Sequence, residues 1–428
     1  MSIVRRTILF PLLVLVAPAV FLFVGMQLPV IAKDAAQYHS YAINLTTGHG
    51  YSIDGATFST LREPGYPFFL AVIYGIFGAG NLMALVVVQT ALLGLLGLLV
   101  YRLFVEQQKV LLGLVAGLVT SLAPWYGLYT HIMSTEILFT VLLGILFYIC
   151  VKIALSKGDS HWYWYAMVGA VSGYATLVRV QLLFFLPILA LLFIFSLRPM
   201  SLQKIRKLML AIGLFMVVIG SWMFYVHQHA GTYSITSGRP EVVLYMRAAR
   251  AQLSYAQLTQ YAYDWLHRSI SGGLGTPFLM DNEFAKLGQD YNHIASTSAS
   301  VAAVKKQNIA AITGNLGHYL YGNLIEILKL SWIEHDYSDF LNRYFRASLY
   351  VVAYALFLFG LVQVIYKKRE RNMTVILIVA LTFIAYNYLV LTPFDTIPRY
   401  NTPYLVFYLI VGIAGVALWR DRTLPPAP

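Results

Sequence analysis

Residues 33–70 read KDAAQYHSYAINLTTGHGYSIDGATFSTLREPGYPFFL, and they form the first long polar interval in a chain that is otherwise mostly apolar. This interval lies between the apolar run 8–30 and the aliphatic residues that follow Asn81. A polar segment between two long apolar runs is typical of a loop displayed at one face of a bilayer. The chemistry of this loop therefore bears directly on function.

The first half of the loop has the pattern of a short amphipathic helix. One stripe at helical spacing carries polar groups and the next carries mostly apolar ones: Asp34, Gln37, Tyr41 and Asn44, then Ala35, Tyr38, Ala42 and Leu45. Gly48 and Gly50 are typical of a helix end. The string 60–67 then predicts a rigid turn that leads into a second, apolar and aromatic helix over 68–77. We expect the segment 66–78 to be re-entrant or interfacial, because it is too short to cross a bilayer easily.

Composition places the whole chain in a membrane. Hydrophobic residues make up 59% of the sequence and charged residues 11%, and the mean hydropathy is +0.68. We predict an all-α polytopic membrane protein with about ten transmembrane helices, at 8–30, 82–104, 110–128, 135–155, 163–179, 181–197, 207–226, 346–366, 373–391 and 402–419. The segment 1–30 is expected to be a retained first span, since its apolar run is longer than that of a signal peptide.

The distribution of charge predicts the orientation. With the N terminus in the cytoplasm, the inner segments hold 16 of the 30 basic residues but only four of the 18 acidic residues. The whole net charge of +12 then lies on the cytoplasmic side, in agreement with the positive-inside rule. The basic balance is thus a topology signal and gives no indication of a nucleic-acid partner. We expect a multi-pass protein of the inner (plasma) membrane.

Three regions follow from this topology. Residues 1–226 form an N-terminal transmembrane module whose first outer loop spans 31–80. Residues 227–345 form an extracytoplasmic region with several helical patterns, long enough for a small helical subdomain. Residues 346–428 form the C-terminal transmembrane helices.

Four elements on the predicted outer face carry acids and arginines: the helix that begins at Asp34, the turn with Arg62 and Glu63, the turn 131–136, and the turn with Arg399 and Tyr400. This combination suits the transfer of a sugar from a lipid phosphate. Arginines hold a phosphate bidentately and stabilise the charge that develops as the glycosidic bond breaks. A carboxylate takes the proton from the attacking hydroxyl, and a single displacement inverts the anomeric carbon.

Several of these residues also have simpler explanations. Asp34 is either this base or only an acid at a helix start, and Glu136 is either a second carboxylate or the first-turn acid of a helix capped by Ser134 or Thr135. Arg179 either extends to the membrane surface or binds an anion, a carboxylate or a lipid phosphate. Tyr38, Tyr66 and Tyr400 either pack against the sugar or isoprenoid or serve as interface aromatics.

Several short strings follow one another along the chain. They are Asp34-x3-Tyr38, Gly48-x-Gly50-Tyr51 and Arg62–Leu70 in the first loop, then Ala123–Trp125 with Thr135–Phe139, Ala175–Arg179, and Pro398–Tyr400 with Pro403. Together they resemble GT-C glycosyltransferases, in particular the branch of protein O-mannosyltransferases and lipid A aminoarabinose transferases. The resemblance covers most of the chain and is most specific in the first loop. We expect no counterpart in this sequence of the C-terminal soluble domain of the larger relatives.

The resemblance implies a GT-C-like fold, a polyprenyl-phosphate sugar as donor, and an acceptor that is an extracytoplasmic lipid, glycan or protein. It implies Asp34 as the base or acceptor-orienting acid. Arg62, Arg179 and Arg399 are then candidate phosphate partners, with Arg399 preferred. Some GT-C enzymes use a divalent cation, and His131 with Asp34 and Glu136 would supply ligands. The same topology also leaves open a transporter or flippase of lipid-linked sugars, or an enzyme resembling O-antigen ligases.

Overall fold

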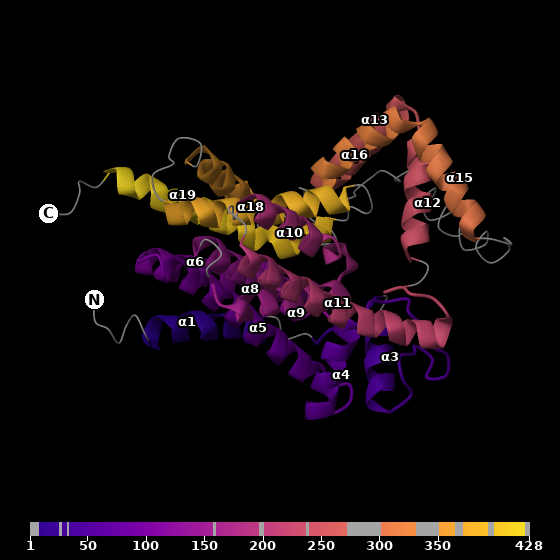
Figure 1. Ribbon diagram of the computed structural model, residues 1–428, viewed down its shortest axis with the longest axis horizontal. Coiled ribbons are helices and arrows are strands. Elements are labelled where there is room, and N and C mark those ends of the chain that lie inside the picture. Colours follow the sequence, from indigo (N-terminus) through magenta and orange to yellow (C-terminus); the bar gives the residue numbers. More distant parts are fainter. Residues whose placement is uncertain are drawn as a thin grey trace. The chain divides into compact units, whose positions relative to one another are not determined.

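The computed structural model describes residues 8–24, 28–31, 34–156, 160–196, 201–236, 239–271, 301–330, 351–363, 371–392 and 398–423. Within these ranges every regular element is a helix, and residues 52 and 58 form an isolated β-bridge. The prediction of an all-α protein is therefore confirmed. Figure 1 shows the helices along the chain.

The chain divides into two compact units, 1–236 with 351–386 and 402–428, and 237–350 with 387–401. The first unit contains the first loop and most of the apolar helices. Its elements begin with α1 (Phe10–Val16), η2 (Ala17–Ala19), α2 (Val20–Val24), α3 (Asp34–Thr46), α4 (Gly65–Phe77), α5 (Leu82–Val105), α6 (Val110–Ser121) and α7 (Pro124–Thr130). They continue with α8 (Glu136–Leu155), α9 (Trp162–Val178), η3 (Val180–Leu182), α10 (Phe185–Ser196), α11 (Leu202–Ala230), most of α18 (Arg371–Leu391) and α19 (Leu405–Thr423).

Five of the described helices are long and apolar enough to cross a membrane, namely α5, α8, α11, α18 and the segment Tyr400–Trp419. The pair α6 and α7 would make a sixth, but it bends by 47°. The bend has a sequence cause, because Pro124 at the start of α7 cannot donate the hydrogen bond that would continue α6. The chain is thus a multi-pass membrane protein, while the predicted total of about ten spans stays a prediction.

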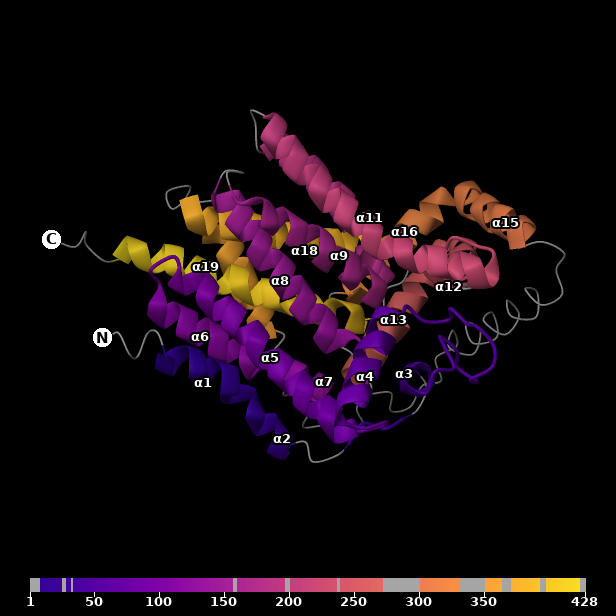
Figure 2. The same ribbon diagram turned by 60° about the horizontal axis from the view of Figure 1, so that its bottom comes forward.

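The helices of the first unit pack closely around α5 and α9. Helix α5 contacts α1, α6 and α8, and α9 contacts α8 and α11. Figure 2 shows α5, α6 and α8 beside one another. Small residues allow this approach: a Cβ on Gly169 would lie 2.2 Å from the carbonyl oxygen of Ala211 in α11.

The first loop folds as the sequence predicts, with one shift in a boundary. Helix α3 ends at Thr46, and Gly48 and Gly50 follow with φ values of 84° and 74°, which only glycine adopts without strain. Helix α4 begins at Gly65 instead of residue 68. Pro67 is compatible with this earlier start because the N–H groups of the first helical turn have no partner within the helix. Helices α3 and α4 contact each other.

Four described helices of the second unit lie within the region predicted to form a small helical subdomain, whose bounds of 227–345 stay a prediction. They are α12 (Arg239–Ala251), α13 (Tyr255–Ser271), α15 (Val301–Gly314) and α16 (Leu316–Leu330). Leu258, Tyr261 and Ile325 form a buried cluster between α13 and α16. The helix η4 (Pro398–Tyr404) begins in this unit and ends in the first.

Candidate active site

Arg62 is bound to one face of α3. Its Nη2 donates to Asp34 Oδ1 at 2.5 Å, and its Nε donates to Gln37 Oε1 at 2.5 Å. Its guanidinium carbon lies 5.5 Å from the centre of the Tyr38 ring. These partners share one helix face because they are three and four residues apart. The Arg62 side chain is 12% exposed and that of Asp34 is 36% exposed, so the carboxylate is the more accessible member of the pair.

The backbone of this turn is fixed by an aromatic group. The Tyr51 hydroxyl donates to the carbonyl oxygen of Arg62 at 2.9 Å. The Tyr51 ring stacks on Tyr41 at 4.2 Å and meets Trp222 of α11 edge-on at 4.8 Å. Burial raises the pKa of Tyr51 well above its ordinary value, so its hydroxyl stays protonated and remains a donor. The loop is therefore held against α11 while it presents Arg62 to α3.

Tyr66 continues this network into the helices. Its ring meets Tyr38 edge-on with centroids 5.0 Å apart, and its hydroxyl donates to Gln89 Oε1 of α5 at 3.2 Å. The Gln89 amide nitrogen in turn donates to the carbonyl oxygens of Thr130 at 2.9 Å and Ile132 at 3.1 Å. Tyr66 and Gln89 are both fully buried. The first loop is thereby connected to α5 and to the turn that precedes α8.

Burial, followed by charge interactions with Tyr38 and Glu136, raises the pKa of Tyr66 well above its ordinary value. A hydrogen bond with the backbone of Ser134 has the opposite, weaker effect. The Tyr66 hydroxyl therefore stays protonated and remains a donor.

Glu136 itself is paired with Arg179. The Nη2 of Arg179 donates to Glu136 Oε1, its Nε donates to Thr135 Oγ1 at 2.6 Å, and its guanidinium carbon lies 5.5 Å from the centre of the Phe139 ring. Arg179 is 8% exposed and Glu136 is 2% exposed. Of the alternatives considered for Arg179, the structure has the carboxylate partner and not the extended surface conformation. Thr135 is the N-cap residue of α8, but its hydroxyl accepts from Arg179 and makes no cap hydrogen bond.

The two ion pairs belong to elements that pack directly on each other. A Cβ on Gly65 would lie 2.7 Å from the backbone of Leu177 and Val178, at the end of α9 immediately before Arg179. The Tyr174 hydroxyl donates to the carbonyl oxygen of Gly65 at 2.9 Å. Glycine is required at this contact because any side chain would collide with backbone atoms. The turn with Arg62 and the buried Glu63 is consequently pressed onto the segment that carries Arg179.

The residues that could supply ligands to a divalent cation each have another partner in the structure. His131 Nε2 hydrogen-bonds with the carbonyl oxygen of Phe21 at 2.9 Å, Asp34 pairs with Arg62, and Glu136 pairs with Arg179. In the part of the chain that the structure describes, there is no group of three or more His, Cys, Asp or Glu side chains that would hold a metal ion. The hypothesis of a divalent cation on His131, Asp34 and Glu136 therefore has no support from this geometry.

Arg399 and Tyr400 lie in the second unit, in η4. The side chain of Arg399 is outside the described residues. Tyr400 is 8% exposed and packs with Leu391 and Tyr388. The predicted roles of Arg399 and Tyr400 at the site stay predictions.

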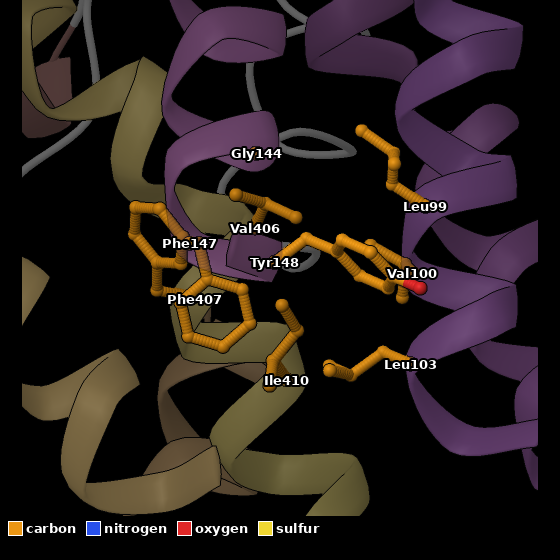
Figure 3. Close-up of a pocket in the computed structure, with 9 residues that line it drawn as sticks. All are labelled: Leu99, Val100, Leu103, Gly144, Phe147, Tyr148, Val406, Phe407 and Ile410. Atoms are coloured by element: carbon orange, nitrogen blue, oxygen red, sulfur yellow. The ribbon is translucent and has the colours of Figure 1, made fainter. Parts of the chain in front are cut away.

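One described cavity in the helical core is too small for a substrate. Figure 3 shows its lining, which comes from α5, α8 and α19 and includes Leu99, Phe147 and Phe407. Its volume is about 10 Å³, which is room for about one water molecule. We interpret it as a packing gap between three helices.

Two residues of the network were not predicted from the sequence. Gln37 holds Arg62, and Gln89 links Tyr66 to the turn before α8. Gln37 shares the helical stripe of Asp34, which is a usable signal. Gln89 lies within an apolar run, where a lone amide is itself a sign of a buried hydrogen bond.

Comparison with known proteins gives one family match and two similar solved structures. Residues 62–223 match the family of dolichyl-phosphate-mannose-protein mannosyltransferases. This range contains Arg62, Glu63, Tyr66, Glu136 and Arg179. No curated protein sequence shows significant similarity to the chain.

Solved structures of ArnT from Cupriavidus metallidurans are similar over nearly the whole length. The structure bound to undecaprenyl phosphate has 15% identity and a TM-score of 0.43, and the match covers 99% of this chain and 82% of that one. The apo structure has 16% identity and a TM-score of 0.40, covering 95% and 76%. With TM-scores below 0.5, these superpositions support no residue-level correspondence. The family match over residues 62–223 agrees with the resemblance of the sequence motifs to GT-C glycosyltransferases, and five of the described helices are long and apolar enough to cross a membrane.

Proposed function

We propose that this protein transfers a sugar from a polyprenyl-phosphate donor to an acceptor at the outer face of the membrane. The acceptor that we favour is an envelope lipid or glycan. The observation that carries the proposal is the pair of Asp34 and Arg62 in the first loop. This pair places a partly exposed carboxylate beside a cation, in a loop between membrane helices. The description of the matching family, which names a dolichyl-phosphate sugar, supports the donor class.

In this mechanism Asp34 is the general base. The acceptor hydroxyl oxygen attacks the anomeric carbon of the donor, and the bond between that carbon and the phosphate oxygen breaks. The electron pair stays on the phosphate, and the hydroxyl proton passes to Asp34. One displacement inverts the anomeric centre. Carboxylates are ordinarily ionised at neutral pH, so Asp34 is able to accept a proton there.

Arg62 has a second role toward the donor. A guanidinium beside the base is well placed to bind the phosphate and to stabilise its charge as the bond breaks. Donor phosphate would then share Arg62 with Asp34, so binding and base activation are coupled. Arg399 is a further phosphate partner in the proposal, and Tyr38, Tyr66 and Tyr400 pack against the sugar or isoprenoid.

The ion pair of Glu136 and Arg179 supports the same site. Both charges are already neutralised by each other, and Arg179 also holds Thr135. We propose that this ion pair fixes the start of α8 against the first loop, through Tyr66. Glu136 would act as a second carboxylate only if its ion pair with Arg179 were broken. Glu63 and His131 fix the two turns in this arrangement.

The charge distribution supports the orientation. The N terminus is in the cytoplasm, the first loop is at the outer face, and the membrane is the inner (plasma) membrane. Acceptor recognition then belongs to the second unit and to the outer ends of the helices.

The test is donor turnover by the full-length protein in proteoliposomes. A polyprenyl-phosphate sugar is incorporated, candidate acceptors are supplied from outside, and free polyprenyl phosphate is measured with and without acceptor. The proposal predicts acceptor-dependent release of polyprenyl phosphate and a product with inverted configuration. If the intact lipid-linked sugar crosses the bilayer without cleavage, the protein is a transporter and the proposal is wrong. Asp34→Asn protein in the same vesicles controls for background cleavage.

A further inference from the structure

A cavity of about 390 Å³ lies at the start of α9, at the opposite end of this helix from Arg179. The 17 residues of α9 separate the two ends by about 25 Å. Six residues of the lining come from the start of α9 and the start of α11: Ser160, His161, Trp162, Gln203, Arg206 and Lys207. None of these six is acidic, and two are permanently cationic at neutral pH. The volume is within the range of about 300–1,000 Å³ that is typical of small-molecule sites.

The cavity wall is built to receive an oxygen-rich anion. Ser160 is 8% exposed, and its hydroxyl is buried without a hydrogen-bond partner. A buried hydroxyl without a partner is destabilising, and the oxygen of a ligand in the cavity would satisfy it. Lys207 is held in place, since its Nζ donates to the carbonyl oxygen of Ser160 at 2.7 Å and lies 5.9 Å from the centre of the Tyr165 ring.

The start of α9 adds to this preference for negative charge. His161, the N-cap residue, makes no side-chain cap hydrogen bond, whereas its carbonyl oxygen accepts from the N–H of Trp164 at 3.2 Å. Backbone N–H groups at a helix start attract anions. The guanidinium of Arg206 and the ammonium of Lys207 reinforce the same field.

The cavity also lies at the depth where lipid headgroups are expected. Trp162 and Tyr163 are 63% and 41% exposed on the first turn of α9. Exposed Trp and Tyr at the end of an apolar helix are typical of the membrane–water interface. The positive-inside orientation assigns this end of α9 to the cytoplasmic leaflet.

We propose that the cavity between the starts of α9 and α11 binds the phosphate of an anionic lipid headgroup, with Arg206, Lys207 and the Ser160 hydroxyl as its ligands. The basic side chains neutralise the phosphate, and the Ser160 hydroxyl donates to one of its oxygens. This site is distinct from the donor site at the first loop. A bound lipid would join α9 to α11 at their cytoplasmic ends.

The test compares lipid binding to full-length protein in uncharged detergent, measured by native mass spectrometry. The probes are phosphatidylglycerol, phosphatidylcholine and inorganic phosphate. Wild-type protein should bind the first phosphatidylglycerol about tenfold more tightly than phosphatidylcholine. Arg206→Gln and Ser160→Ala should each lower the phosphatidylglycerol affinity by about tenfold, the loss typical of one charge-assisted hydrogen bond.

Lys204→Gln is the matched control, because it removes the same charge from the same turn of α11 without lying in the cavity wall. It should keep the wild-type preference. Ser160→Ala protein without lipid should unfold at the wild-type temperature or above, since it loses only an unsatisfied hydroxyl. Equal loss in Lys204→Gln and Arg206→Gln, or no loss in Arg206→Gln and Ser160→Ala, would overturn the proposal. If inorganic phosphate binds as tightly as phosphatidylglycerol and the same variants abolish its binding, the ligand is a soluble anion. That result would overturn the assignment to a lipid.

Discussion

Arg62 and Asp34 are 28 positions apart in sequence, yet Nη2 of the arginine lies 2.5 Å from Oδ1 of the acid. The contact closes the first loop on itself and places Asp34, the acid at the start of α3, beside a cation. It depends on the turn that carries Arg62, which packs through Gly65 on the end of α9. The site therefore depends on packing contacts as much as on its charged groups.

Gly65→Ala tests that packing. The added methyl group would lie 2.7 Å from backbone atoms of Leu177 and Val178, so the turn must shift. Overpacking of this kind costs about 1–3 kcal/mol. We expect a lower unfolding temperature in detergent and a loss of sugar transfer. Gly75→Ala in the same helix is the control: nothing lies within 4 Å of its Cβ, and it should be neutral or stabilising because alanine favours helix. Similar stability of the two variants would contradict this packing.

Glu136→Gln tests the buried ion pair. The change removes the carboxylate that pairs with buried Arg179, and breaking a buried ion pair costs about 3–5 kcal/mol in soluble proteins. Thr135→Ala should cost less, about 1 kcal/mol, because it removes one neutral acceptor. Unfolding temperatures of the variants in detergent measure both. The double variant Glu136→Leu with Arg179→Met should recover much of the stability. If the double variant also recovers turnover, the role of the ion pair is structural. If Glu136→Gln is as stable as wild type, the ion pair contributes nothing to stability.

Tyr66→Phe tests the link from the first loop to α5. It removes the hydroxyl that donates to Gln89 Oε1 at 3.2 Å and leaves a buried acceptor unsatisfied. We expect a loss of about 1–3 kcal/mol in stability, measured by unfolding in detergent. Turnover should fall less than in Asp34→Asn, because Tyr66 has no role in proton transfer. A loss of turnover as large as that of Asp34→Asn would assign Tyr66 to the chemistry.

His39 predicts an acid-side loss of stability. Burial lowers the pKa of His39, whose Nδ1 hydrogen-bonds with the Tyr74 hydroxyl at 2.9 Å. The unfolded chain therefore takes up a proton at higher pH than the folded protein does. The stabilisation from neutral His39 is present above the unfolded pKa of 6.5 and declines as the pH falls through the lowered folded value. Unfolding temperatures of wild type should decrease more steeply from pH 7.5 to 5.5 than those of His39→Gln. Parallel curves would contradict the prediction.

Local features were predictable from the sequence, whereas side-chain pairing was predictable only in part. The helix from Asp34 and its end at Gly48 follow from periodicity and glycine, which act within a few residues. Arg179 was expected to need an anion, and Glu136 supplies it, but the choice between a protein carboxylate and a lipid phosphate depends on how α8 and α9 pack. His131 looked like a ligand because it is near Glu136 in sequence; it turns instead to the carbonyl oxygen of Phe21. Gln37 and Gln89 carry no charge, so no charge pattern reveals them.

The central claim is that Asp34 accepts the proton of the acceptor. The most direct measurement is the single-turnover rate of sugar transfer from pre-bound polyprenyl-phosphate donor, for wild type, Asp34→Asn and the control Asp54→Asn. Asp54 is an acid of the same loop whose oxygens accept from Ala56, Thr57 and Ser52, and an asparagine keeps one acceptor there. We predict that Asp34→Asn lowers the single-turnover rate by about 10²-fold or more, with donor affinity at or above that of wild type, unfolding temperature close to wild type and Asp54→Asn near the wild-type rate. Transfer by Asp34→Asn at the wild-type rate would contradict the account and move the chemistry to another residue.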